Sequence, residues 1–119
     1  MIALTLPYPP TMNMYWRNVA IRGKPRTLIS ADGRNYKTAV AMLGKKCRAR
    51  PLAGPLRVVL VVYRPRRIGD LDNVLKPVLD ALKGIAFEDD SQVTQLLATR
   101  CDDKENPRVE VKVWPMGEE

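Results

Sequence analysis

Histidine is absent from this chain, and its absence excludes several kinds of active site. A Ser-His-Asp triad, a Cys-His dyad, a histidine general base and nearly every zinc site need that side chain. Cysteine is scarce as well: Cys47 and Cys101 lie far apart without metal-ligand spacing, so we expect two reduced thiols. Any catalysis must therefore use carboxylates, lysine, arginine, tyrosine, hydroxyl groups and hard metal ions.

Long apolar segments are also missing. No apolar run approaches the ~20 residues that a membrane-spanning helix needs. No basic segment followed by an apolar one indicates a secretion signal at the N-terminus. We therefore expect a cytoplasmic protein without membrane contact. The 119 residues suit one hydrophobic core, so we predict a single domain over residues 1–119.

Acidic residues are almost missing from the first half of the chain. Residues 1–69 hold 14 Lys or Arg and one acid, Asp32, for a net charge of +13. Residues 70–119 hold 6 Lys or Arg and 12 acids, for a net charge of −6. A basic half this lopsided favours a polyanionic partner, most simply nucleic acid. The alternative is a basic protein that has no such partner.

Hydrophobic periodicity predicts an α+β fold, a small mixed β-sheet with two main helices. The segment over residues 56–63 is almost continuously apolar, which indicates a central strand covered on both faces. The predicted strands cover residues 2–6, 56–63, 93–101 and 108–114, and the predicted helices run from Ser30 to about Lys46 and over residues 71–82.

Each predicted helix has an apolar stripe. Pro77 interrupts the second helix, because an interior proline removes a backbone donor and clashes one turn back. Either that helix begins late or its first turn is distorted, and both outcomes put Asp70 and Asp72 at a strand-to-helix junction. The first stripe comprises Tyr36, Val40, Leu43 and Cys47, and the second comprises Leu71, Leu75, Val78, Leu79 and Leu82.

The segment from Asn13 to Arg26 is aromatic and basic but lacks a clear period. We interpret it as an ordered surface loop that stacks on bases and contacts phosphates. An alternative with equal support is that Tyr15 and Trp16 cap the core, because aromatic side chains are often buried. The candidate nucleic-acid contacts here are Asn13, Tyr15, Trp16 and Arg17.

Asp70 and Asp72 lie two residues apart, directly after a basic run. On an extended or turning backbone, this spacing puts both carboxylates on one side. The loop that carries Asp89 and Asp90 returns from the helix to the sheet and can bring further carboxylates close. Converging carboxylates repel one another, and Mg²⁺ or Mn²⁺ relieves that repulsion through oxygen coordination. The alternative is that the two aspartates only cap a helix and interact favourably with the positive end of its dipole.

Several motifs recur in an order and spacing that resemble the RusA family of Holliday junction resolvases, which are commonly carried by phages or prophages. The resemblance runs nearly from end to end. The motifs lie at residues 6–13, 30–33 with Tyr36, 66–73, 76–77, 80–82, Gly84 and 89–93.

The resemblance implies a homodimeric, Mg²⁺-dependent endonuclease that cuts paired strands of four-way DNA junctions in recombination and repair. The family's catalytic and metal-binding aspartates fall on Asp70, Asp72 and Asp90, and its essential lysine falls on Lys76. Lys76 is also expected to contact DNA. Some members carry a basic residue where this chain has Gly69, and we expect Arg66 and Arg67 to supply that charge. A twofold junction substrate also favours a twofold dimer.

Two other functions stay open from the residues alone. One is a non-catalytic, basic nucleic-acid-binding protein whose acids only cap and solvate. The other is a metal nuclease that acts on flaps or RNA. The carboxylate cluster favours a nuclease over the binding protein, and the family resemblance favours the junction over other substrates.

Overall fold

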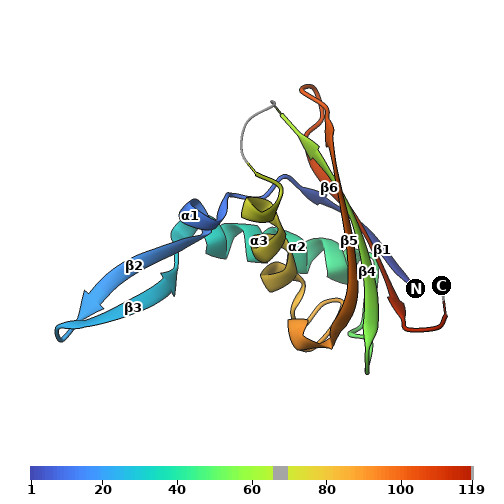
Figure 1. Cartoon of the computed structure of the whole chain (residues 1–119), viewed down its shortest axis with the longest axis horizontal. Coiled ribbons are helices and arrows are strands. Elements are labelled where there is room, and N and C mark those ends of the chain that lie inside the picture. The colour runs from blue at the N-terminus through green and yellow to red at the C-terminus, as the bar shows by residue number, and fades with distance from the viewer. Residues whose placement is uncertain (66–69, 119) are drawn as a thin grey trace.

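Strand β4 (Leu56–Arg64) lies inside the sheet, as its apolar sequence predicts. The computed structural model describes residues 1–65 and 70–118 (Figure 1). The main sheet has the strand order β1-β6-β4-β5, with β4 and β5 parallel and the other pairs antiparallel, which confirms the mixed α+β fold. The other strands of this sheet are β1 (Ile2–Pro7), β5 (Val93–Asp102) and β6 (Arg108–Pro115).

Helices α2 (Ala31–Lys46) and α3 (Asp72–Leu82) pack on one side of this sheet (Figure 1). The core lies between them and the strands, because alternate residues of β4 and β6 point inward. The outward residues of β4 are only half-buried, so the prediction that this strand is covered on both faces was wrong. The inward residues are Leu56, Val58, Leu60 and Val62 from β4, and Val109, Val111 and Val113 from β6.

Helix α2 begins as predicted. The Ser30 hydroxyl accepts a hydrogen bond from the Gly33 amide at 3.0 Å, which satisfies one free donor of the first turn. Tyr36 and Val40 are buried, as expected from the apolar stripe. Cys47 departs from that prediction: it follows the last helical residue and is exposed. Both cysteines are free thiols.

Helix α3 continues through Pro77, which is buried inside it. Asp72 is its first residue and Asp70 precedes it, so both aspartates lie at the start of the helix, as predicted. The buried face differs from the predicted stripe, because Leu71, Leu75 and Leu79 are only partly buried. The fully buried residues are Val74, Pro77, Val78, Ala81 and Leu82.

The segment expected to be a loop is instead a short helix followed by a β-hairpin. Helix α1 (Met12–Tyr15) leads into β2 (Trp16–Ile21), which pairs with β3 (Lys24–Ile29) in a separate two-stranded sheet. The turn residues Arg22 and Gly23 have φ values of 53° and 75°, as a two-residue hairpin requires. Pro25 weakens the strand pattern in the sequence, but a two-stranded ribbon consists of edge strands that tolerate proline.

No helix in the described part of the chain is long and apolar enough to cross a membrane.

Candidate active site and nucleic-acid interface

The aspartates at the start of α3 are exposed. The Asp70 carbonyl accepts a hydrogen bond from the Asn73 amide, and the Leu71 carbonyl accepts one from the Val74 amide, both at 3.2 Å. These bonds close the first turn, and no side chain caps it. Within residues 1–65 and 70–118, neither the Asp70 nor the Asp72 carboxylate has a hydrogen-bond or ion-pair partner. The geometry therefore does not support a capping role for either side chain, although Asp72 lies in the first turn, where its charge favours the helix dipole.

Asp90 lies in a different environment, in the short 3-10 helix η1 (Asp90–Gln92) before β5. Asp89 caps this turn: its carboxylate accepts a hydrogen bond from the Ser91 amide at 3.3 Å. Gln92 completes a capping box and also donates hydrogen bonds to the Leu52 and Gly54 carbonyls, at 2.9 and 3.0 Å. These contacts hold the turn that carries Asp90 against the loop before β4.

The Lys83 ammonium group lies among three carboxylates. Its Nζ is 3.6 Å from Asp80 Oδ1, 3.9 Å from Asp89 Oδ1 and 3.9 Å from Asp90 Oδ2. Hydrogen bonds from Ser91, with a smaller contribution from Lys83, hold the pKa of Asp89 below its usual value. Asp89 and Asp90 therefore have an internal counter-charge, which Asp70 and Asp72 do not have among the described residues.

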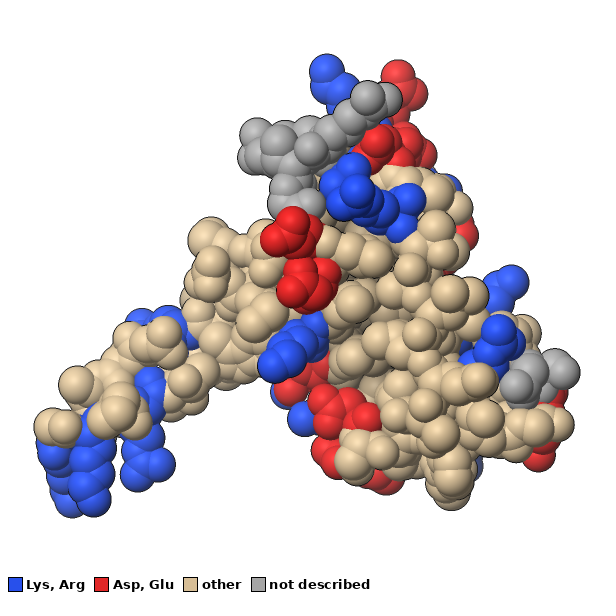
Figure 2. Space-filling model, in the orientation of Figure 1, with Lys and Arg blue, Asp and Glu red and all other residues tan. Residues whose placement is uncertain are grey.

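The structure thus places two of the predicted metal ligands, Asp70 and Asp72, at the start of α3 and the third, Asp90, in η1. No three histidine, cysteine, aspartate or glutamate side chains of the described residues converge closely enough to hold a metal ion. Figure 2 shows one group of acidic atoms near the middle of this face and another below it, with basic atoms between these two. The donor chemistry still fits Mg²⁺, since this ion often uses one or two carboxylates and completes its shell with water and substrate phosphate. Asp70 and Asp72 meet that need, and Asp90 as a third ligand stays a prediction.

Lys76 is exposed on α3, one turn after Asp72. An ion pair with Asp72 or Asp80, each four residues away, would give Lys76 a purely structural role, and neither pair forms. Asp80 instead accepts a hydrogen bond from the Tyr15 hydroxyl at 2.6 Å and lies near Lys37, at 3.8 Å, and Lys83. The Lys76 ammonium group has no carboxylate partner among the residues with described positions, so it is available to a phosphate.

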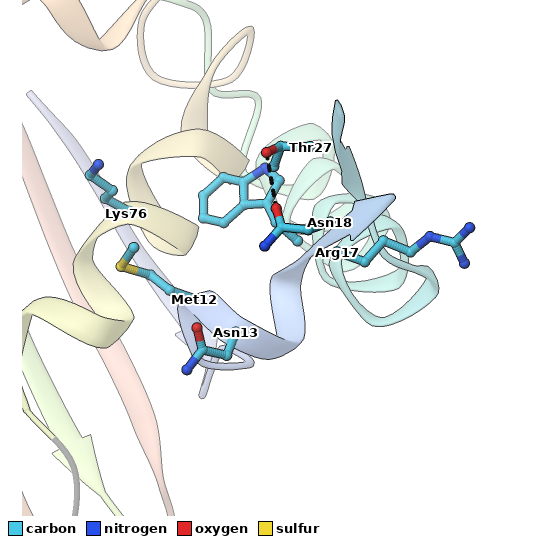
Figure 3. A pocket seen from close by; sticks show the side chains of 7 residues that line it. Met12, Asn13, Arg17, Asn18, Thr27 and Lys76 are labelled. Carbon is cyan, nitrogen blue, oxygen red and sulfur yellow. Dashed lines mark hydrogen bonds between the residues drawn. The ribbon is translucent and has the colours of Figure 1, made fainter. Parts of the chain in front are cut away.

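A cavity of about 590 Å³ lies between α1, the β2–β3 hairpin and α3 (Figure 3). Four of the predicted nucleic-acid contacts line it, which brings residues far apart in the sequence to one place. Asn18 and Thr27 also line it and were missed, because their pairing depends on the hairpin register; the Thr27 hydroxyl donates to Asn18 Oδ1 at 3.1 Å. The lining residues are Met12, Asn13, Trp16, Arg17, Asn18, Thr27 and Lys76.

Tyr15 does not serve as a base-stacking residue. Its side chain is fully buried, and its ring meets the Trp16 ring edge-on at a centroid distance of 4.3 Å. Burial, followed by the hydrogen bond to Asp80, raises the pKa of Tyr15 far above its usual value. The core-capping alternative is therefore correct for Tyr15. Trp16 also packs against the core but is partly exposed in the cavity.

The basic run before Asp70 is only partly described. Arg64 is buried, and its guanidinium forms a hydrogen bond at 3.1 Å and an ion pair at 2.9 Å with Asp102 Oδ1. Its role is therefore to hold the ends of β4 and β5 together. Arg66 and Arg67, predicted to contact DNA, and Gly69 lie outside the described residues.

Comparison with known proteins agrees with the geometry. A family model described as "Endodeoxyribonuclease RusA" matches residues 7–114. The crossover junction endodeoxyribonuclease RusA of Escherichia coli (strain K12) is 34% identical over 120 residues, which cover 98% of this chain and 97% of that protein. The protein of the same name from Enterobacteria phage 82 is 35% identical over 119 residues, covering 98% and 96%. This chain belongs to the RusA family of endodeoxyribonucleases.

Proposed function

We propose that this protein is a Mg²⁺-dependent endodeoxyribonuclease that resolves four-way (Holliday) DNA junctions in recombination and repair. The names of its full-length relatives support the reaction and the substrate. The observation that carries the proposal is the pair of exposed carboxylates, Asp70 and Asp72, without partners among the described residues and one helical turn from Lys76. A protein that acts on DNA in this way is expected in the cytoplasm.

The chain's own residues have distinct roles in the proposed reaction. Asp70 and Asp72 hold the metal ion, and Asp90 is the proposed third ligand. When bound, Mg²⁺ supplies a water nucleophile and neutralises charge on the phosphate. The water would lose a proton as its oxygen bonds to phosphorus and the bond to the leaving oxygen breaks, and the leaving oxygen would take up a proton.

Lys76 is the proposed electrostatic stabiliser of this reaction. Lys76 lies on the helix that begins with Asp72 and lines the cavity beside the hairpin. A phosphate bound at the aspartates lies within one helical turn of it, so Lys76 can offset the charge that develops in the transition state. Asn13, Trp16 and Arg17 extend the contact surface along the cavity.

We further propose that the active protein is a homodimer. A four-way junction has two strands to cut about a twofold axis, and two copies of this chain related by a twofold place one site at each strand. Light scattering of the purified protein tests this directly, with a mass of twice 13.4 kDa as the expected result. A monomer that cuts both strands at once would contradict it.

Three DNA substrates test the reaction and its specificity. A mobile four-way junction, a flap and a linear duplex are incubated with the protein, with and without Mg²⁺. We expect paired cuts in the junction only, no cleavage without the metal, and partial or full activity with Mn²⁺. Preferred cleavage of the flap, or of an RNA substrate added in parallel, would support a different nuclease; binding without cleavage would support the non-catalytic alternative.

A further inference from the structure

The β2–β3 hairpin extends away from the rest of the molecule as an arm (Figure 1). Its register runs from Trp16 opposite Ile29 to Ile21 opposite Lys24, so six residues on each side give a reach of about 20 Å. Most of its residues are exposed. An isolated two-stranded hairpin is only marginally stable, so this arm depends on its base and on whatever it binds.

The base of the arm is fixed to the body. The Ser30 amide and hydroxyl both donate to the Tyr15 carbonyl, each at 2.8 Å. A Cβ atom at Gly33 would collide with this same carbonyl, so α2 approaches the base closely. The Tyr15 hydroxyl joins the base to Asp80 on α3. The arm therefore has a defined direction relative to the helix that begins with Asp72.

The arm carries four positive charges and no negative one. They are Arg17, Arg22, Lys24 and Arg26, all exposed and none paired with a carboxylate of the described residues. Figure 2 shows basic atoms gathered toward the tip of the arm, away from the acidic groups of the body. Like charges this close destabilise an isolated hairpin, and a polyanion offsets that cost.

The two faces of the arm differ in chemistry. Side chains alternate along a strand, and the register puts Arg17, Lys24 and Arg26 on one face. The opposite face carries Asn18 and Thr27, which line the cavity together with Lys76. Arg17 is among the residues that line the cavity, but Figure 3 shows its guanidinium pointing away from it. One face of the arm thus lies toward the DNA strand at the active site. The opposite face is open to a ligand on the far side of the arm.

We propose that the cationic face binds the phosphate backbone of a second duplex arm of the junction, next to the arm that is cut. This proposal rests on the proposed function and explains how the protein distinguishes branched DNA from linear DNA. A two-stranded ribbon is narrow enough to lie against a groove of duplex DNA, and arginine and lysine are its usual phosphate contacts. A linear duplex occupies one side of the ribbon, whereas a junction supplies DNA to both sides.

The test compares two triple variants with the same loss of charge. The arm variant is Arg22→Gln/Lys24→Gln/Arg26→Gln, and the control is Lys45→Gln/Lys46→Gln/Arg48→Gln at the end of α2. All six residues are exposed, and Arg22 and Arg48 share a positive φ, of 53° and 56°. Binding to a four-way junction and to a linear duplex is measured by fluorescence anisotropy in EDTA, over a range of salt concentrations.

We expect the arm variant to bind the junction about tenfold to a hundredfold more weakly, with a salt slope smaller by about three. Its affinity for the linear duplex should fall much less, and the control should change junction binding only slightly. Equal losses in the two triple variants, or equal losses for junction and duplex, would overturn the proposal. So would an arm variant whose dimer mass falls while its binding per dimer is unchanged, because the arm would then bind a second copy of the chain.

Two further measurements keep the result clear. Thermal unfolding of both variants shows whether the arm substitutions disturb the fold, and single Arg26→Gln and Lys24→Gln variants replace the triple if they do. Mg²⁺-dependent cleavage by the unaltered protein is run in parallel. Its absence would refute the proposed nuclease function, whereas the junction-to-duplex binding ratio tests the arm separately.

Discussion

Two pairs of acidic residues stand at opposite ends of α3, and their surroundings differ. Asp70 and Asp72, at the start, have exposed carboxylates without partners among the residues whose positions are described. Asp89 and Asp90, beyond the end, lie near Lys83, and Asp89 also caps a turn. A carboxylate with an internal counter-charge contributes to the fold by itself, whereas an exposed one without such a partner is open to a ligand. On this comparison, we propose the first pair as the primary metal site.

The largest effect is expected from the first pair. Asp70→Asn or Asp72→Asn should reduce junction cleavage by on the order of a thousandfold or more, because metal-ion stabilisation of the transition state amounts to several kcal/mol. Junction binding should survive or tighten, since a negative charge near the phosphates is lost. Single-turnover cleavage and binding of the same junction are the measurements. Cleavage of normal rate in Mg²⁺ would disprove the site.

The same change at Asp90 tests whether the two pairs share one function. We expect Asp90→Asn to abolish cleavage while junction binding is retained, as for a third metal ligand. Asp89→Asn is the matched control, because it removes the same charge one residue earlier and also lies 3.9 Å from Lys83. If both variants cleave within a few-fold of the unaltered protein, the second pair is only structural.

Lys76→Gln should slow cleavage by about a hundredfold to a thousandfold, since it removes one preorganised charge at the phosphate. Lys83→Gln is the comparison at the other end of the same helix, where the ammonium group already has carboxylate neighbours. The effect of Lys76→Gln should fall on the rate at saturating enzyme rather than on junction affinity. A larger rate loss in Lys83→Gln than in Lys76→Gln would reverse the assignment.

The contact between the arm's base and α3 gives a smaller, structural effect. Tyr15→Phe deletes the hydroxyl that donates to Asp80 at 2.6 Å and leaves that carboxylate with Lys37 and Lys83. We expect a loss of about 1–3 kcal/mol in the free energy of unfolding, because the bond to a charged acceptor is partly buried. Urea denaturation measures it, and an unchanged midpoint would mean that the contact is weak in solution.

The smallest effect is the pH dependence from Asp89. Its pKa is lower in the folded chain than in the unfolded chain, because Ser91 donates to the charged form. Its contribution to stability is therefore present above the ordinary aspartate pKa of 3.8 and is lost as the pH falls through the depressed folded value. Asp89→Asn should weaken this acid sensitivity in urea unfolding measured between neutral and acidic pH. An identical pH profile would show that the cap contributes nothing measurable.

The local sequence pattern was sufficient to predict an element where that element carries a capping residue or a hydrophobic period of its own. Ser30 at the start of α2 and the apolar run of β4 predicted those elements, because capping and hydrophobic periodicity depend on near neighbours. The hairpin was missed since Pro25 broke its strand pattern and its residues face solvent on both sides. Tyr15 was ambiguous in the sequence, because a tyrosine suits both a core and a base-stacking surface.

The sequence alone determined the kinds of chemistry that are possible. The lack of histidine restricts catalysis to carboxylates, lysine, arginine, tyrosine, hydroxyl groups and hard metal ions. The spacing of Asp70, Asp72 and Lys76 places all three near the start of one helix. Only the tertiary structure decided how these groups are used. Tertiary packing places Lys83 among three acids and forms the cavity beside Lys76, and the hairpin register gives the arm two chemically different faces. Such contacts join residues far apart in the chain, and local sequence pattern carries no information about them.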